Sequence, residues 1–171
     1  GDVVVSEDYI FIGYSDIDEF NRFQVSRTNT LALNFISKKF PNKKVIGFQL
    51  NKSDDISLNN CLHLDCCFQP LGLGHVILYP DGFKYKKDVD FIYNLFNEDN
   101  VIIISKEEMG QMFSNLFSIS KNTVVSEIGF SRLNQLLIDR GYLVESVHFS
   151  EISKMGGLLR CTTLPLTRSY E

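Results

Sequence analysis

Short apolar stretches recur along this chain in an order that predicts strands and helices. Stretches rich in β-branched residues predict strands, and apolar residues three or four positions apart predict helices. The expected strands are residues 2–5, 9–13, 45–50, 62–68, 75–79, 101–105, 115–119, 123–126, 143–148 and 158–166. The expected helices are residues 29–40, 88–96, 107–112 and 130–140, and residues 15–26 are expected to form a polar loop. The pattern indicates a mixed α/β protein.

Two of the predicted helices carry further signals. In the first, Leu31 and Phe35 predict an apolar stripe together with Leu33, Ile36 and Phe40, which lie beside them at helical spacing. In the last, Ser131 is a candidate N-cap and Gly141 is a stop signal.

The order strand, strand, helix, strand is predicted three times, over residues 1–50, 61–105 and 113–150, with a closing strand at 158–166. A repeat of roughly 50 residues is typical of architectures in which each unit packs on its neighbours. The sequence therefore predicts repeated ββαβ units in a propeller-like α/β ring, all within a single domain over residues 1–171. An irregular α+β domain stays open as the alternative.

The composition is that of a globular protein and argues against some partners. Hydrophobic residues make up 44% of the 171 residues and charged residues 22%, which is typical of soluble domains. The formal net charge of −4 argues against binding to nucleic acid, and no apolar stretch approaches the ~20 residues of a membrane span. The four cysteines form no evident disulfide framework, which favours a reducing compartment and a cytoplasmic location.

Candidate chemistry lies in two places. Cys161 follows the glycine pair Gly156-Gly157, near the start of the last predicted strand. His63 and Asp65 lie two positions apart in another predicted strand, where alternate residues share a face. A thiol, an imidazole and a carboxylate that the fold brings together form a plausible site for nucleophilic catalysis.

Simpler roles for these residues stay open. A cysteine is often a small buried hydrophobe, and His63 can be a hydrogen-bonded core residue. Cys66 and Cys67 are interpreted as packing residues. Cys61, His63, Asp65 and Cys66 could suggest zinc, but their spacing fits none of the usual paired-ligand patterns. No metal and no cofactor are predicted.

Four short elements resemble a known superfamily when they are taken in order. They are Gly1-Asp2-Val3-Val4, Ser26-Arg27-Thr28-Asn29, Leu62-His63-Leu64-Asp65 and Gly157-Leu158-Leu159-Arg160-Cys161. The first resembles the end of a Glu/Asp-Gly-Gly-Asp-Val segment, and the second an Arg-Thr-Asn/Ser element. The third resembles a His-x-Asp element, and the fourth the glycine-rich segment before a catalytic cysteine. Together they resemble the C-terminal half of the guanidino-group-modifying enzymes, which include arginine deiminases, dimethylarginine dimethylaminohydrolases and amidinotransferases.

The resemblance implies a fold and a role for each candidate residue. The implied fold is the pentein fold, a five-bladed propeller of ββαβ units. Cys161 is the implied nucleophile and His63 the implied general acid and base. The implied substrate-binding residues are Asp65 on the guanidinium, Arg27 and Asn115 near the amino-acid end, and Asp2. The first acid of the Glu/Asp-Gly-Gly-Asp segment, which pairs with the histidine in the superfamily, is expected just before Gly1.

These roles imply a cysteine hydrolase of guanidino compounds that needs neither metal nor cofactor. It would cleave a guanidinium C–N bond through a covalent thiouronium and release a ureido product. Two alternatives stay open: an amidinotransferase that passes the amidino group to an amine, and a non-catalytic fragment or binding protein with the same fold. The expected partners are a small guanidino substrate such as arginine, and an N-terminal half or further copies of the chain; neither nucleic acid nor a membrane is expected.

Overall fold

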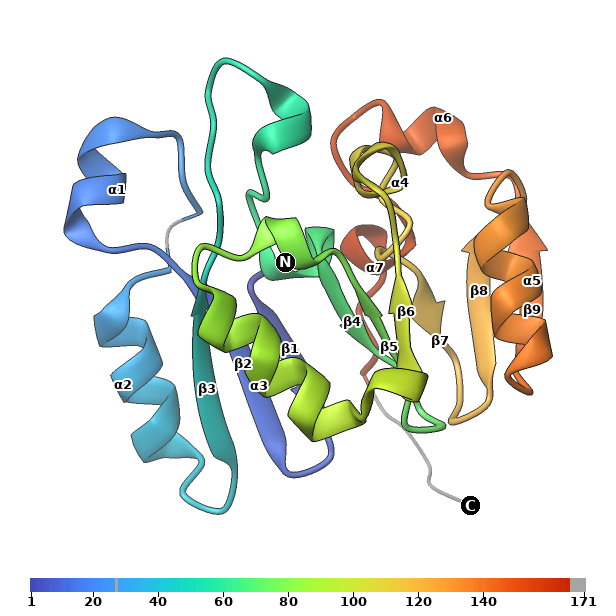
Figure 1. The fold of residues 1–171 in the computed structure, drawn as a ribbon, viewed down its shortest axis with the longest axis horizontal. Coiled ribbons are helices and arrows are strands. Elements are labelled where there is room, and N and C mark those ends of the chain that lie inside the picture. The colour runs from blue at the N-terminus through green and yellow to red at the C-terminus, as the bar shows by residue number, and fades with distance from the viewer. Residues whose placement is uncertain (27, 167–171) are drawn as a thin grey trace. The chain divides into compact units, whose positions relative to one another are not determined.

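Three small sheets repeat one arrangement of strands (Figure 1). In each sheet the first strand pairs antiparallel with the second, and the second pairs parallel with the third. The first sheet contains β1 (Val3–Ser6), β2 (Tyr9–Tyr14) and β3 (Lys44–Gln49), the second β4 (Phe68–Pro70), β5 (Val76–Leu78) and β6 (Val101–Ile103), and the third β7 (Phe117–Ser118), β8 (Thr123–Glu127) and β9 (Leu143–Val147). The repeated ββαβ unit predicted from the sequence is confirmed.

The computed structural model describes residues 1–26 and 28–166. Contacts within the chain group into two compact units, Gly1–Ser114 and Asn115–Glu171. The first unit contains the first two sheets, and the second unit contains the third.

Helices connect the parallel strands of each sheet, because parallel neighbours need a long crossover between them. The described helices are α1 (Ile17–Arg22), α2 (Thr30–Lys39), α3 (Lys86–Phe96), α4 (Lys106–Gly110), α5 (Ser131–Asp139), α6 (Ser150–Ser153) and α7 (Leu159–Thr162). The short 3₁₀ helices are η1 (Ser57–Asn59), η2 (Leu64–Cys66), η3 (Pro80–Gly82) and η4 (Glu98–Asn100). The crossover helices α2, α3 and α5 confirm the predicted ones, and none of the described helices is long and apolar enough to span a membrane.

Three sequence predictions about secondary structure are wrong. The expected polar loop 15–26 contains α1, which Asp16 caps through a hydrogen bond from the Glu19 amide at 3.0 Å. The expected strand 62–68 is the 3₁₀ helix η2 followed by β4, and the expected strand 158–166 contains α7 instead. In both strands, turn hydrogen bonds formed by the local backbone outweigh the β-propensity of the side chains.

Two smaller predictions also need correction. Ser131 is the first residue of α5, so the N-cap position belongs to Phe130 and Ser131 does not cap the helix. The expected strand 115–119 is reduced to the two residues of β7, and Asn115 lies outside it.

Aromatic side chains fill the core of the first unit. Phe11 on β2 and Phe48 on β3 stack with their ring centroids 5.8 Å apart. Phe68 on β4 meets them edge-on, at 5.0 and 5.9 Å, and all three side chains are at most 1% exposed. From α3, Phe91 reaches Phe48 at 6.4 Å, and α3 crosses the strands in Figure 1. Edge-to-face pairs of this kind add to the gain from burial and join the first sheet to the second.

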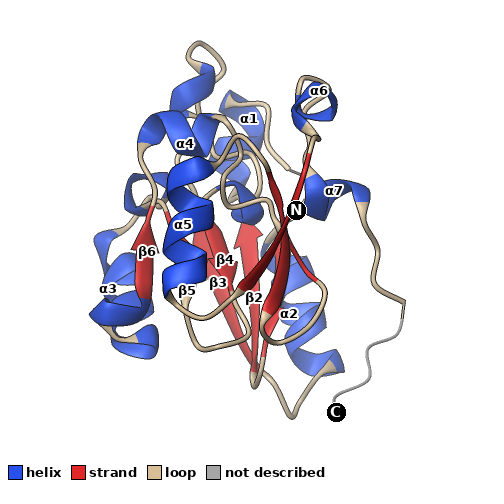
Figure 2. Ribbon diagram, turned by 90° about the vertical axis from the view of Figure 1, so that its right-hand side faces the viewer, coloured by secondary structure: helices blue, strands red, loops and turns tan. Residues whose placement is uncertain are grey.

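The α2 helix buries only part of the apolar surface that its sequence predicts. It lies beside β2 and β3, where Leu33 packs against Gly47 so closely that a Cβ on Gly47 would stand 2.8 Å from Leu33 Cδ2 (Figures 1 and 2). Leu31 and Phe35 are 73% and 65% exposed, so they do not contribute to the core. The predicted apolar stripe is therefore only partly buried, through Leu33.

We expect Phe68→Ala to lower the free energy of unfolding by about 3–5 kcal/mol, because the ring is fully buried and its loss leaves a cavity between the two sheets. Urea denaturation followed by circular dichroism measures the change. Phe35→Ala removes the same ring from a 65% exposed position and should cost less than about 0.5 kcal/mol. Equal losses in the two variants would contradict the assignment of this core.

Candidate active site

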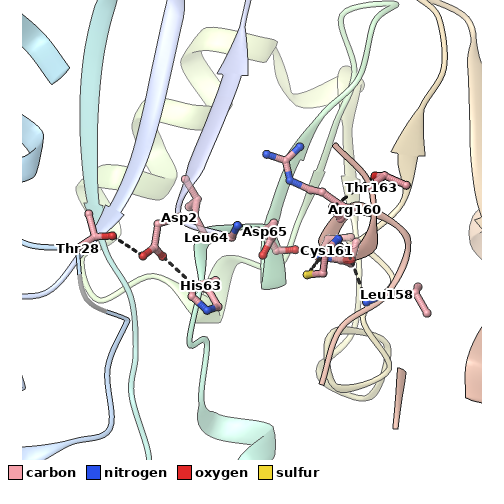
Figure 3. Close-up of polar contacts among 12 residues, drawn as sticks. Asp2, Thr28, His63, Leu64, Asp65, Leu158, Arg160, Cys161 and Thr163 are labelled. Carbon is pink, nitrogen blue, oxygen red and sulfur yellow. Dashed lines mark hydrogen bonds and ion pairs between the residues drawn. The ribbon is translucent and has the colours of Figure 1, made fainter. Parts of the chain in front are cut away.

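A chain of hydrogen bonds in the first unit ends on His63. Thr28 Oγ1 donates to Asp2 Oδ2 at 2.6 Å, and Asp2 Oδ1 lies 3.2 Å from His63 Nδ1 (Figure 3). A carboxylate can only accept, so this contact places the proton of the neutral imidazole on Nδ1. The other ring nitrogen, Nε2, is then left to take up a proton.

The environment of Asp2 keeps it ionised. Burial by itself would raise the pKa of the Asp2 carboxyl group, and its side chain is only 8% exposed. Hydrogen bonds from His63, Ser26 and Thr28 outweigh burial, so the pKa lies below its ordinary value of 3.8. His63 is more open, with 40% of its side chain exposed. The pair thus combines a fixed anion with an imidazole that a ligand can reach.

Glycine at position 1 permits this close approach. A Cβ at Gly1 would stand 2.5 Å from His63 Cγ, which is closer than any side chain tolerates. The backbone holds the same contact, because the Asp65 amide donates to Gly1 O at 3.2 Å and the Gly13 amide donates to Asp2 O at 2.9 Å. The start of β1 is therefore fixed between β2 and η2, and Asp2 is directed at His63.

Asp65 lies inside η2 and is 1% exposed. Its backbone carbonyl accepts a hydrogen bond from Ser114 Oγ at 2.8 Å, and the nitrogen of Gly1 lies 3.5 Å from Asp65 Oδ2. Because residues 64–66 form a 3₁₀ turn, the argument that His63 and Asp65 share one face of a strand does not apply. The fold still places both residues next to the start of β1.

In the second unit, Asn115 organises the segment that carries Cys161. Asn115 Oδ1 accepts from the amides of Leu158 and Cys161, both at 3.2 Å. Asn115 Nδ2 donates to Cys161 Sγ at 3.2 Å, and Asn115 itself is 2% exposed. One buried carboxamide thus holds both the backbone and the sulfur of the exposed Cys161. An N–H donor directed at sulfur stabilises a thiolate.

The glycine pair explains why Cys161 lies on a helix. Gly156 has a φ of +86°, a left-handed conformation that favours glycine and turns the chain into α7. A Cβ on Gly157 would stand 3.0 Å from Cys161 Cβ, so the chain passes close to the cysteine. Leu158 and Leu159 are buried and anchor the short helix, which Figure 2 shows followed by a loop.

The structure groups the predicted site residues by unit. Asp2, His63 and Asp65 come together in the first unit, and Asn115 contacts Cys161 in the second. Arg27 lies outside the described residues. Sequence reasoning gave no role to Thr28, although it lies in the quoted Arg-Thr-Asn element, and it did not foresee that Asn115 holds the thiol. Neither contact leaves a local signal, because the partners are far apart in the sequence.

Metal ligands do not cluster in the part of the chain that the structure describes. No group of three or more His, Cys, Asp or Glu side chains there is placed to hold a metal ion.

Comparison with known proteins identifies relatives. The family model described as N,N dimethylarginine dimethylhydrolase, eukaryotic, matches residues 21–168. The uncharacterized protein YkgA of Bacillus subtilis is 28% identical over 168 residues, which cover 98% of this chain and 51% of YkgA. ZK1307.1 of Caenorhabditis elegans, also uncharacterized, is 34% identical over 113 residues, 66% of this chain and 39% of that protein. The chain thus spans about half, or less, of the length of these relatives.

Solved structures share the fold. One is the N-terminal domain of ArgZ, a cyanobacterial arginine dihydrolase, in a crystal structure with its substrate. Its TM-score is 0.77 at 20% identity, and the match covers 96% of this chain and 54% of the ArgZ chain. A dimethylarginine dimethylaminohydrolase with an S-methyl-L-thiocitrulline adduct has a TM-score of 0.66 at 20% identity, with 94% and 53% covered. The resemblance to the guanidino-modifying superfamily, drawn from four short motifs, is confirmed.

We expect Asp2→Asn to destabilise the protein by about 1–2 kcal/mol at pH 7, through loss of a charge-assisted hydrogen bond. The pKa of Asp2 is lower in the folded state than in the unfolded state, so the carboxylate stabilises the fold above pH 3.8. That contribution disappears as the pH falls through the lower, folded-state pKa. Urea denaturation between pH 7 and pH 3 should therefore show the two proteins converging in acid. A difference in the free energy of unfolding that stays constant from pH 7 to pH 3 would contradict the lowered pKa of Asp2. Asp8→Asn, at an exposed position, serves as the control.

We expect Asn115→Asp to slow alkylation of Cys161 by iodoacetamide at pH 7 by about tenfold. The substitution keeps the acceptor for the two amides but removes the N–H donor and places a negative charge beside the sulfur. Mass spectrometry of the peptide that carries Cys161 measures the rate. Asn122→Asp makes the same charge change at an exposed turn and should leave the rate unaltered. Equal alkylation rates in wild type and Asn115→Asp would contradict the assignment of Asn115 as a hydrogen-bond donor to the Cys161 thiol.

Proposed function

The chain belongs to the family described as N,N dimethylarginine dimethylhydrolase, eukaryotic, and from this membership we propose that the protein is a cysteine-dependent hydrolase that cleaves a guanidinium C–N bond. The observation that carries the proposal is the chain of contacts from Thr28 through Asp2 to His63. It fixes an imidazole for proton transfer in the segment that matches the family's His-x-Asp element.

The guanidinium explains why a carboxylate is needed. The cation is delocalised and its carbon is a poor electrophile, so it must be oriented while it keeps its charge. Asp65 is proposed to accept two of its N–H groups in a bidentate pair, which fixes the plane of the substrate. Two opposite charges about 4 Å apart attract by roughly 4 kcal/mol at an effective dielectric constant near 20. Asp65 is 1% exposed, so this attraction is weakly screened.

Cys161 is the proposed nucleophile. Its thiolate sulfur attacks the guanidinium carbon and forms a C–S bond, and the C–N bond to the leaving amine then breaks. His63 Nε2, which has taken the proton of the Cys161 thiol, gives this proton to the departing nitrogen, and a covalent thiouronium is left on the sulfur. The hydrogen bond from Asn115 Nδ2 supports the thiolate before the attack.

Water completes the reaction. His63 takes a proton from a water molecule, the water oxygen attacks the thiouronium carbon, and the C–S bond breaks. The products are a ureido compound and the free thiolate. Asp2 holds the imidazole in one orientation in both steps and stabilises the imidazolium form, a role that contributes to general acid–base rates of typically 10²–10⁴-fold.

The test uses the protein in its full natural length with arginine, methylated arginines and agmatine. Mass spectrometry should detect a ureido product from at least one of them. We expect Cys161→Ser and His63→Gln each to lower kcat/KM by more than about 10³-fold. The kcat/KM of the double variant should be no lower than that of the less active single variant. This non-additivity is expected because both groups act in one reaction.

Cys66→Ser serves as the matched control, since it changes a cysteine outside the proposed chemistry and should retain activity. Product formed at an undiminished rate by Cys161→Ser would overturn the proposal. Product formed only when a second amine is supplied would replace the hydrolase with an amidinotransferase.

A further inference from the structure

Two cysteines that the proposed chemistry does not use lie at the two ends of the segment that carries His63 and Asp65. Cys61 and Cys67 belong to the first unit and are 1% and 0% exposed. Between them lie His63, which contacts Asp2, and the 3₁₀ helix η2. Any bond between the two sulfurs would therefore act directly on this segment.

The two thiols meet at Gly82, at the end of η3. A Cβ on Gly82 would stand 2.9 Å from Cys61 Sγ and 3.1 Å from Cys67 Sγ, so both sulfurs border one small space. The Cys67 thiol donates a hydrogen bond to Leu64 O at 3.5 Å, and its sulfur lies within interaction reach of the Cys61 thiol. A disulfide bond requires the two sulfurs to approach to ~2.05 Å. A side chain larger than hydrogen at position 82 would occupy the same space.

The surroundings give the two thiols different reactivities. The hydrogen bond from Cys67 lowers the pKa of the Cys61 thiol, against the effect of burial, and the Lys52 ammonium lowers it further. Burial raises the pKa of the Cys67 thiol and keeps it protonated. Lys52 is held near Cys61 because its Nζ donates to the carbonyls of Cys61 at 2.7 Å and Leu62 at 2.9 Å. Cys61 is thus suited to react first and Cys67 to resolve the product.

We propose that Cys61 and Cys67 form an oxidisable dithiol, and that its conversion to a disulfide by a hydroperoxide displaces the His63 segment and switches off the site. The Cys61 thiolate attacks the peroxide O–O bond, takes one oxygen as a sulfenic acid and releases hydroxide or an alkoxide. The Cys67 sulfur then attacks the sulfenic sulfur, the S–O bond breaks, and water leaves. The two thiols lose two electrons to the peroxide, and a thiol reductant reverses the bond.

The expected effect on the segment follows from its hydrogen bonds. The turn is held by Cys66 N donating to His63 O at 3.2 Å and Cys67 N donating to Leu64 O at 3.1 Å. It is fixed to β1 by the Asp65 amide on Gly1 O at 3.2 Å. A disulfide would draw Cys67 toward Cys61 and bring the two ends of this segment closer together. This movement would strain the contact of His63 with Asp2. The loop 51–60, which precedes Cys61, consists of exposed or half-buried residues.

The first experiment tests the bond without using activity. Cys161→Ser protein of full natural length is treated with hydrogen peroxide, and its free thiols are then blocked with iodoacetamide. After reduction, the newly released thiols are labelled with N-ethylmaleimide and located by mass spectrometry. We expect the second label, N-ethylmaleimide, on Cys61 and Cys67, and the first label, from iodoacetamide, on Cys66. A second label that includes Cys66, or its absence from Cys61 and Cys67, would overturn the dithiol.

The second experiment tests the switch, which rests on the proposed function. Diamide, an oxidant that joins paired thiols, should lower kcat/KM of the wild-type protein by at least about tenfold, and dithiothreitol should restore it. Cys61→Ser and Cys67→Ala should each keep their activity within about twofold under diamide, while Cys66→Ser should lose it like wild type. Disulfide formation with full activity would overturn the switch. Were no guanidine hydrolysed at all, the labelling experiment would still decide the dithiol, and the His63 NMR signals would show whether the segment moves on oxidation.

Discussion

The close contact between the start of β1 and η2 is the constraint on which the first half of the site depends. Asp2 can reach His63 only because Gly1 has no side chain, since a Cβ there would lie 2.5 Å from the imidazole. The backbone bonds from Asp65 to Gly1 and from Gly13 to Asp2 hold this geometry at both ends. A buried carboxylate is costly unless it is hydrogen-bonded, and His63, Thr28 and Ser26 meet that requirement. The interactions that keep Asp2 charged are therefore the same ones that orient the imidazole.

The second unit solves a similar problem with a neutral group. Asn115 has an acceptor and a donor on one side chain, and it uses the first for two backbone amides and the second for the Cys161 sulfur. A carboxylate would satisfy the amides equally well but would repel a thiolate. A buried carboxamide therefore suits a reactive cysteine better than an acid does. Each unit thus places one buried polar side chain behind one exposed reactive group.

The aromatic core of the first unit stabilises the segment that carries His63. Phe11, Phe48 and Phe68 join two small sheets that would each bury little surface alone. Because β4 begins directly after η2, the packing of Phe68 fixes the end of the segment that carries His63. At the other end of that segment, Lys52 holds the carbonyls of Cys61 and Leu62. The segment that carries His63 is therefore held by packing at one end and by the half-buried Lys52 ammonium at the other.

The sequence by itself determined the order of the elements and the identity of the chemical groups. Residue periodicity was enough for the ββαβ repeat, because strand and helix patterns depend on neighbours a few positions apart. Four short motifs were enough for the superfamily. The local shape of both reactive segments was beyond this reasoning, since residues 62–68 and 158–166 have the composition of strands but form short helical turns.

Only the tertiary structure decided which polar groups meet. The Asp2–His63 and Asn115–Cys161 contacts join residues 61 and 46 positions apart, and nothing in a local pattern specifies such a pairing. The same holds for burial, because Leu31 and Phe35 match the apolar stripe of a helix yet are exposed on α2. Hydrogen bonds and packing act between atoms in space, so their partners are fixed only once the chain has folded.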